Sequence, residues 1–592
     1  MPGPNKLRFD FISPKLANSN TTNPIHSSYL TLNYVPPLAS PPLQLVILLG
    51  SDSPGTYDAV PARIEKEGND LDMAIAKFRM AAYLWQAYTV SIYLWKNKPL
   101  EWHSTDCNNQ AEQMHRNKLG RRTFRLEEDW TTGTSNFRDR ETGGMRSEAK
   151  VHVVRSSKTV AEIRDANIAQ QNKNATNPGA LYGIAMEAMN KYFKPRPGQK
   201  HYVSCLILDS HWDKSQNLIL GHAALGGEGG NIALGICGSH ALQSYPSSLE
   251  EVVPAFTDCT PTDTDYVAND CGESGSSWEA ANIGIGAHMH ETGHLFGLPH
   301  QVNGVMARDY VTLNRSFTTR EPYSTRTQSR GGIYASPNDE CTWHRLDVLQ
   351  FKTHPCFALP TDPVRYSDDT VQAWPVGNGQ VIVTAVSGIA LIEIYTEGDD
   401  CCRYWMEYGD GNGLGPIQRQ IILTELALRD RIPEEKRKSK LKLKIKSIAG
   451  GSHEIQDFNI LTSKGSQVKL SNGQLAFRSS KLGFSEMEGS TPEEVIFGSA
   501  VKQTCLMLSI KIYHGFALDG LEFFYEDHTH ELFGKRGGQP GGSEFVLGKC
   551  PHGANYVSCL TSGRYPQRRV HHRVLCESWP VGGWSFDHDE FG

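Results

Sequence analysis

Strand-like and helix-like patterns of apolar residues alternate along the chain up to about residue 360. The run LQLVILL at residues 43–49 is apolar except for Gln44, which is typical of a strand buried on both faces. Apolar positions between Leu71 and Trp85 recur every three or four residues and predict an amphipathic helix. The same reasoning predicts a strand, a helix, a strand and a helix at residues 151–154, 180–193, 201–208 and 343–351. A β-α-β-α-β order of this kind predicts a sheet with crossover helices.

Gly-rich and alternating segments follow these elements. Residues 218–236 hold two short strand candidates separated by the glycine-rich GGEGG. From about residue 362, short alternating runs such as QVIVTAV (380–386) dominate, and these predict all-β structure. The lysine-rich run KRKSKLKLKIK (436–446) could be a nucleic-acid patch or a strand with its lysines in water. The strict alternation of lysine with Leu or Ile favours the strand.

One short segment carries a specific chemical pattern. Residues 290–300 read HETGHLFGLPH, so His290 and His294 lie four residues apart on one face of a helix. Gly297 can adopt the left-handed conformation that ends a helix, after which the chain can return His300 to the same point. Three histidine nitrogens leave the fourth position of a tetrahedral Zn²⁺ open for water, as catalysis requires.

Glu291 follows the first predicted ligand and is rotated about 100° from it around the helix. It can therefore lie beside the metal without binding it, where it can serve as the general base that deprotonates a zinc-bound water. Two alternatives stay open, namely a buried histidine helix without metal and a zinc site that has lost catalysis. His288 lies on another face of the helix, and we expect it to be structural or solvated.

Composition and charge narrow the class of protein. The chain has 592 residues, which suggests three or four domains, and a formal net charge of −6. That balance argues against a nucleic-acid binder, and no apolar run is long enough to cross a bilayer. The first 34 residues lack the apolar core of a secretory signal, and the 13 cysteines follow no CxxC pattern. We therefore expect a cytoplasmic protein with no membrane partner.

The zinc segment resembles the extended signature of the metzincin metallopeptidases. Those enzymes place a methionine beneath the zinc after a turn, and Gly304-Val305-Met306 resembles that Met-turn. The resemblance implies a mixed sheet with a zinc-binding helix and an edge strand that binds extended peptide. Residues 231–236 are the candidate for that edge strand. The family likeness assigns no role to Tyr310, which follows the methionine by four residues instead of two.

The wider context is similar to fungal zinc metallopeptidases that carry a jacalin-like lectin domain. Residues 510–548 resemble the first part of a jacalin-like β-prism, with two alternating strands joined at Asp519-Gly520 and a glycine-rich loop after them. The sequence after Gly548 is irregular and rich in Arg and His, so a glycan partner is only a weak expectation. Residues 549–592 do not alternate as closing strands should.

These observations predict a multidomain α/β plus all-β protein. The predicted parts are a metzincin-like catalytic domain at 1–361, a β-sandwich-like module at 362–479 and a partial jacalin-like β-prism with an atypical tail at 480–592. The predicted function is peptide-bond hydrolysis, more plausibly inside a peptide or protein substrate than at its ends. One catalytic Zn²⁺ is expected, and no other cofactor. The alternative is a carbohydrate- or protein-binding adaptor with a relic zinc site.

Overall fold

A computed structural model describes the parts of the chain that position these residues. The described residues are 3–11, 26–34, 40–92, 122–128, 137–138, 145–146, 148–331, 339–359, 362, 369–377, 379–409, 416–462, 467–469, 475–477, 507–514, 518–525, 527–538, 543–546, 562–564 and 570–572. They form two compact units, and each is described by itself. The first unit spans residues 1–367, 399–417 and 448–450, and the second spans 368–398, 418–447 and 451–592.

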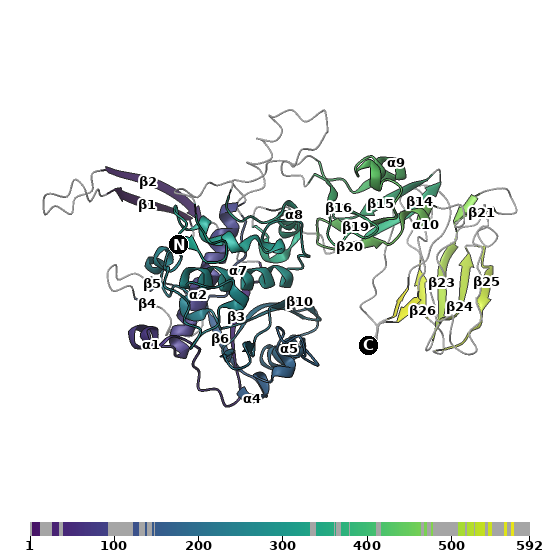
Figure 1. Cartoon of the computed structure of the whole chain (residues 1–592). Helices are drawn as coiled ribbons and strands as arrows, with labels where there is room; N and C mark the ends of the chain where they lie inside the picture. The colour runs from purple at the N-terminus through teal and green to yellow at the C-terminus, as the bar shows by residue number, and fades with distance from the viewer. Residues whose placement is uncertain are drawn as a thin grey trace. The chain divides into compact units, whose positions relative to one another are not determined.

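A five-stranded mixed sheet is the centre of the first unit (Figure 1). Its order is β10 (Leu225–Gly229), β11 (Ile232–Gly238), β7 (His201–Ile207), β3 (Leu43–Leu49) and β6 (Val151–Arg155). The last four strands are parallel to their neighbours, whereas β10 pairs antiparallel with β11 and forms one edge. The predicted strands at 43–49, 151–154 and 201–208 are therefore confirmed.

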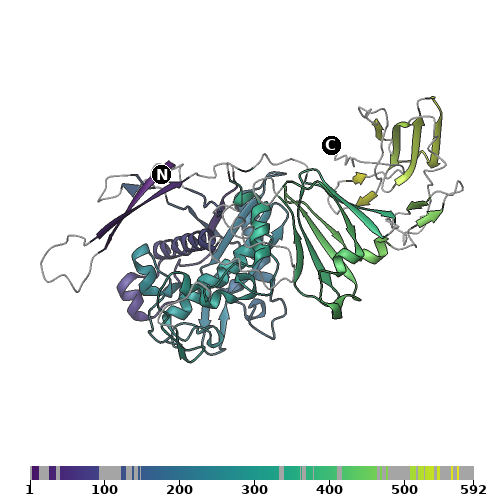
Figure 2. The same ribbon diagram turned by 90° about the horizontal axis from the view of Figure 1, so that it is seen from above.

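Helices cover both faces of this sheet (Figures 1 and 2). Helices α2 (Leu71–Ile92) and α7 (Ser277–Leu295) pack with Leu45 and Ile47 of β3 in one core. Helix α5 (Ala180–Phe193) packs with Val46 and Leu48 of the same strand in a second core. All seven residues of β3 are buried because the strand is covered on both sides, as its almost entirely apolar sequence predicts.

Shorter elements complete the first unit. The helical ones that are described are α1 (Pro61–Glu67), α4 (Val160–Ile163), η1 (Ala166–Ile168), η2 (Leu242–Ser244), η3 (Leu249–Glu251), α6 (Val252–Ala255), η4 (Asp270–Gly272), η5 (Val305–Ala307), η6 (Asp309–Ser316), α8 (Arg345–Thr353) and η7 (Pro355–Phe357). The strands are β1 (Gly3–Phe11), β2 (His26–Tyr34), β4 (Phe137–Arg138), β5 (Met145–Arg146), β8 (His211–Asp213), β9 (Leu218–Leu220), β12 (Tyr323–Ser324), β13 (Ser329–Arg330) and β17 (Tyr404–Glu407).

Antiparallel strands dominate the second unit. A three-stranded sheet contains β14 (Val371–Gly377), β15 (Gln380–Ala385) and β18 (Gln420–Thr424), while β16 (Ile389–Thr396) pairs with β19 (Leu441–Ser447), and β19 with β20 (Ser452–Ile455). A four-stranded sheet has the order β25 (His530–Gly534), β24 (Leu518–Tyr525), β23 (Met507–His514) and β26 (Ser543–Val546). The other described elements are α9 (Glu425–Arg429), η8 (Glu434–Lys436), α10 (Phe458–Thr462), β21 (Gln467–Lys469), β22 (Leu475–Phe477), β27 (Ser562–Arg564) and β28 (Val570–His572).

The lysine-rich run forms a strand, as its alternation predicts. In β19 the leucines and Ile445 are buried and the lysines are half-buried. Lys442 and Lys444 form ion pairs with Glu454 on the neighbouring strand, so the charges are used within the sheet. This arrangement favours the interpretation of the run as a strand and argues against a nucleic-acid patch.

Two local predictions were wrong. The glycine-rich GGEGG does not simply separate two strands, because four of its residues form most of β10, and this makes β11 an inner strand. Residues 231–236 are therefore not the sheet edge. Asp519 and Gly520 lie inside β24 and do not join two strands. The predicted domain limits, including those around residues 361 and 480, stay predictions. Within the described residues, no helix combines the length and the apolar character that crossing a membrane requires.

Candidate metal centre

The predicted zinc ligands lie at the end of α7, a helix that is buried over almost its whole length. Two of its glycines allow neighbouring segments to come unusually close. A Cβ at Gly286 would lie 2.7 Å from the Cβ of Tyr310, and a Cβ at Gly293 would lie 2.5 Å from the Sδ of Met306. The segment after the helix therefore packs directly against the helix backbone at these two points.

Gly297 ends the helix in the way the sequence predicts. Its φ of +80° is left-handed, and its N–H donates to the carbonyl oxygen of His294 (2.9 Å). The N–H of Leu298 donates to the carbonyl oxygen of Gly293 (3.1 Å), which completes a Schellman motif. The chain reverses within three residues, and this reversal brings His300 back beside His294.

The structure brings the three histidines together. One ring nitrogen from each of His290, His294 and His300 lies within 4.8 Å of the others, and this is the one such cluster of His, Cys, Asp or Glu found among the described residues. The Nε2 atoms of His294 and His300 are 3.2 Å apart. Two nitrogens bound to one tetrahedral Zn²⁺ at 2.0–2.1 Å would lie about 3.3 Å apart, so this pair already has the spacing of zinc ligands.

Backbone carbonyls orient two of the three rings. The Nδ1 of His290 donates to the carbonyl oxygen of Val305 (2.9 Å), and the Nδ1 of His294 donates to that of Leu298 (2.8 Å). Because a carbonyl can only accept, each ring carries its proton on Nδ1 and has a free lone pair on Nε2. Burial lowers the pKa of His290 to about 4 and also lowers the pKa of His294, so both rings are neutral at pH 7. Neutral imidazoles are the form that binds a metal.

Glu291 is buried beside this cluster, with 7% of its surface exposed. No described residue donates a hydrogen bond to its carboxylate, and burial raises its pKa to about 8. A divalent cation held by the neighbouring histidines would favour the ionised form and oppose this effect. A buried carboxyl group without a partner costs stability, and such groups are concentrated at functional sites.

Met306 lies beneath the helix, in the turn that also supplies the carbonyl for His290. Gly304 begins this turn with a φ of +85°, and a Cβ there would lie 2.5 Å from the carbonyl oxygen of Thr342. Only glycine combines this backbone angle with so little space. The turn therefore holds two parts of the site, the Val305 carbonyl and the fully buried Met306.

The edge strand β10 crosses the zinc-binding turn of the helix. Gly226 of β10 pairs with Gly235 of β11, and this glycine pair faces the carbonyl of Glu291. A Cβ at Gly226 would overlap that carbonyl oxygen and lie 2.6 Å from the Cβ of His294, and a Cβ at Gly235 would lie 2.8 Å from the same oxygen. Two side chains are thus absent at the position where the sheet edge meets the metal-binding helix.

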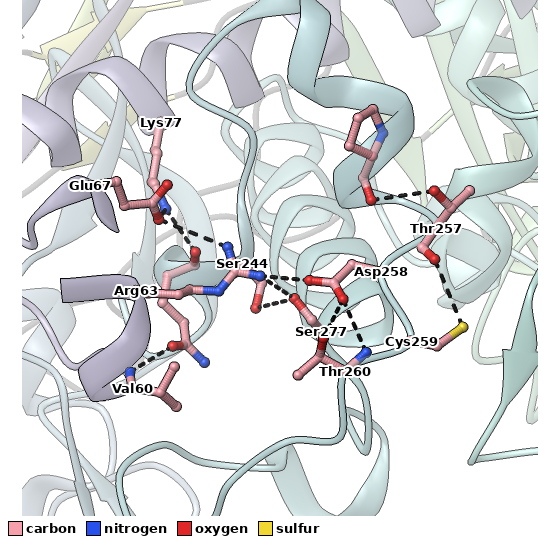
Figure 3. Close-up of polar contacts among 12 residues, drawn as sticks. Val60, Arg63, Glu67, Lys77, Ser244, Thr257, Asp258, Cys259, Thr260 and Ser277 are labelled. Carbon is pink, nitrogen blue, oxygen red and sulfur yellow. Dashed lines mark hydrogen bonds and ion pairs between the residues drawn. The ribbon is translucent and has the colours of Figure 1, made fainter. Parts of the chain in front are cut away.

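A polar network anchors the other end of α7 (Figure 3). Arg63 on α1 donates to Ser277 at the first turn of α7 (2.7 Å) and to Asp258 (2.8 Å). The fully buried Lys77 on α2 donates to Glu67 of α1 (2.7 Å) and to the backbone carbonyl of residue 243 (2.7 Å). Because α1 and α2 are linked through this network, they fix the start of the helix whose end carries the ligands.

Two residues near the centre have positions that the sequence did not reveal. The ring of Tyr310 lies 5.9 Å from the ring of His290, and its hydroxyl accepts a hydrogen bond from Nε of Arg308 (3.2 Å). His288 points away from the cluster, stacks on Phe78 with ring centroids 5.2 Å apart, and shares a hydrogen bond with Ser204 (2.9 Å). Of the two roles expected for His288, structural or solvated, this burial supports the structural one.

The donor set fits a catalytic metal ion. Three converging imidazoles, two of them with fixed tautomers, lie beside a carboxylate that no other described residue binds, as a zinc-dependent hydrolase requires, whereas structural zinc sites have four protein ligands. The fold and the site therefore define the class of metal-dependent hydrolases built on an α/β unit with a mixed sheet.

Comparison with known proteins narrows this class. Residues 1–97 and 109–390 match the family described as "Putative peptidase family" (Metallopep). The chain is 40% identical over 549 residues to "Putative zinc metalloproteinase YIL108W" of Saccharomyces cerevisiae, covering 89% of this chain and 72% of that protein. It is 36% identical over 499 residues to "Putative zinc metalloproteinase C607.06c" of Schizosaccharomyces pombe, covering 84% and 72%. The chain belongs to this peptidase family.

Among solved structures, wild-type OgpA from Akkermansia muciniphila aligns with 70% of this chain and 91% of its own, at 11% identity and a TM-score of 0.35. That score is too low to support an inference about this chain. The family and the names of the relatives agree with the predicted class of zinc metallopeptidase. The metzincin type and the jacalin-like module stay predictions.

Proposed function

We propose that the chain is a zinc-dependent peptidase that cleaves within peptide chains, with Glu291 as its general base. The observation that carries the proposal is the convergence of His290, His294 and His300 beside the buried carboxylate of Glu291, for which the described residues supply no hydrogen-bond donor. One Zn²⁺ per chain is expected. The names of two relatives that share 40% and 36% of their aligned residues with this chain support a zinc peptidase.

Each residue of the centre has a distinct part in this mechanism. Bound Zn²⁺ would lower the pKa of a coordinated water and polarise the carbonyl of the scissile bond. Glu291 accepts the proton of the attacking water and later delivers a proton to the leaving amine. The carbonyls of Val305 and Leu298 keep the Nδ1 atoms of His290 and His294 protonated, so the Nε2 lone pairs of these residues would be available to hold the ion. Met306 supports the turn from below.

The position of β10 suggests how a peptide binds. As the edge strand of the sheet, β10 has backbone groups on its outer side that β11 does not use. An extended peptide can add to such an edge through backbone hydrogen bonds, which tolerate many side chains. Because Gly226 contacts the turn that contains Glu291 and His294, a peptide on this edge would pass the metal centre. We therefore assign the substrate edge to β10 in place of residues 231–236.

The substitution Glu291→Gln tests the assignment of the base. We expect the variant to bind Zn²⁺ with the wild-type stoichiometry but to lose hydrolysis of a peptide library by about 10²–10⁴-fold, the usual contribution of general-base catalysis. Hydrolysis by the wild type should also stop when a chelator removes the metal. Equal rates for the variant and the wild type would refute the role of Glu291. Zinc binding without any hydrolysis by the wild type would instead favour the adaptor with a relic site.

A further inference from the structure

A polar cavity of about 230 Å³ lies beside the N-terminal half of α7. The helix contributes Trp278, Glu279 and Ile283 to its wall, and the hairpin formed by β12 and β13 contributes Arg326 and Arg330. Ligand pockets for drug-sized molecules begin at about 300 Å³, so this cavity is suited to a single side chain.

Most charged groups of the cavity are already paired. Arg315 binds Glu321 through two parallel contacts of 3.0 and 2.8 Å. Glu273 pairs with Arg308 at 3.1 Å. These pairs neutralise two carboxylates and leave their partners little capacity to bind a ligand.

Glu279 forms no ion pair of this kind with any described residue and instead binds the β12–β13 hairpin through hydrogen bonds. It is buried, with 3% of its surface exposed, and accepts hydrogen bonds from the hydroxyls of Ser324 (2.7 Å) and Thr325 (2.5 Å) and from the N–H of Arg326 (3.2 Å). The hydroxyl of Ser276 supplies a fourth bond (2.7 Å). The helix that carries the zinc ligands thus also fixes the position of the hairpin.

Arg326 and Arg330 are the remaining charged residues of the cavity wall. Both are exposed, and within the part of the chain that the structure describes neither guanidinium group has a hydrogen-bond or ion-pair partner. Guanidinium groups bind carboxylates and phosphates strongly because they present several N–H donors in one plane. Two unpaired groups of this kind at the mouth of a cavity with a partly apolar wall favour an anionic side chain as occupant.

A chain of contacts connects this cavity with the metal centre. Glu273 in the cavity wall binds Arg308, Arg308 binds the hydroxyl of Tyr310, and the ring of Tyr310 lies 5.9 Å from that of His290. Along the helix, Ile283 and Glu279 precede His290 by 7 and 11 positions, or about 10 and 16 Å. An extended peptide covers this distance in about three to five residues.

We propose that Arg326 and Arg330 form a specificity subsite for an anionic side chain of the substrate, about three to five residues from the scissile bond. The proposal rests on the proposed peptidase function and adds a preference for acidic substrates. The hairpin provides the positive charge, and the cavity wall provides the apolar contact for the methylene groups of the bound side chain.

The test uses peptides with one common neutral sequence around the cleaved bond. Glu, Gln, Lys or phosphoserine is placed singly three to five residues away on either side. We expect Glu at one position to raise kcat/KM about five- to tenfold over Gln, mainly through a lower KM. Phosphoserine should act in the same direction if the subsite recognises anions in general, whereas a gain limited to Glu would restrict the ligand to carboxylates. Lys should lower kcat/KM.

The double variant Arg326→Glu/Arg330→Glu should lose the preference for Glu and favour Lys at the same position. The pair Arg326→Gln/Arg330→Gln gives a milder change in case charge reversal disturbs the hairpin. Lys173→Glu is the matched control, because Lys173 is exposed in the same unit but outside the cavity. It should keep the wild-type preference.

Two results would overturn the subsite. One is equal cleavage of the Glu and Gln peptides at every position, and the other is a preference for Glu that persists in both double variants. Cleavage of the neutral peptide by the wild type tests the proposed function separately. If no peptide were cleaved, the dissociation constants of fluorescein-labelled Glu and Gln peptides on the Glu291→Gln variant would still decide the subsite: tighter binding of Glu supports it, and equal binding refutes it.

Discussion

The glycine pair between the sheet edge and the zinc-binding helix leads to the sharpest prediction. In the variant Gly226→Ala, the new Cβ would overlap the carbonyl oxygen of Glu291 and lie 2.6 Å from the Cβ of His294. Ordinary contacts begin at 3.4 Å, so β10 and the helix would have to separate by about 1 Å. Both contacts involve the turn that carries the base and a ligand, and neither is with the flexible end of a side chain.

The expected effect has two parts. Overpacking of a close contact costs about 1–3 kcal/mol of the free energy of unfolding. A displacement of about 1 Å in a catalytic site reduces the rate by about 100-fold. We therefore expect Gly226→Ala to remain folded and to lose about two orders of magnitude in kcat/KM for peptide hydrolysis.

The neighbouring glycine is the control. A Cβ at Gly227 would meet only the hydroxyl of Tyr182 at 3.7 Å, which is an ordinary contact. Gly227→Ala should therefore keep its activity, and its free energy of unfolding should stay the same or rise slightly because alanine has less backbone entropy to lose. Urea denaturation and peptide hydrolysis of both variants provide the comparison. If Gly226→Ala matched Gly227→Ala in both assays, the close approach of β10 to the helix would be refuted.

Three further predictions follow from the site and its surroundings. His294→Ala should reduce bound zinc, measured by elemental analysis, to well below one ion per chain, and full retention would contradict the ligand set. Gly293→Ala should lower the free energy of unfolding, measured by urea denaturation, by about 1–3 kcal/mol because its Cβ would lie 2.5 Å from the Sδ of Met306. In a chain that already carries Met306→Ala, the same substitution should cost less. His222 and His288 are buried, and burial lowers the pKa of each to about 3. The unfolded chain therefore takes up protons first as the pH falls, so stability should be constant above about pH 6.5 and decrease below it by up to about 1.4 kcal/mol per histidine per pH unit. For the His288→Asn variant, the free energy of unfolding should fall less steeply with decreasing pH, by the contribution of about one histidine. An unchanged pH dependence would refute the burial of His288 as a neutral group.

The sequence alone determined the features that depend on local spacing. Histidines four residues apart on a helix must share a face, and Gly297 supplies the left-handed residue that reverses the chain toward His300. The apolar run at 43–49, interrupted only by Gln44, predicted a doubly covered strand, and the alternating lysines of 440–446 predicted a half-exposed one. In each case the period of the backbone fixes which side chains lie together, so no distant contact is needed.

Only the tertiary structure decided which strand forms the sheet edge and which groups complete the centre. GGEGG has the composition of a turn, yet it forms a strand because Gly226 must fit against the helix, a requirement set by residues more than sixty positions away. The carbonyl that orients His290 comes from a later turn, and the cavity with Arg326 and Arg330 exists because Glu279 binds the hairpin. Such contacts join segments whose separation along the chain carries no periodic signal, so the packing of the folded chain specifies them.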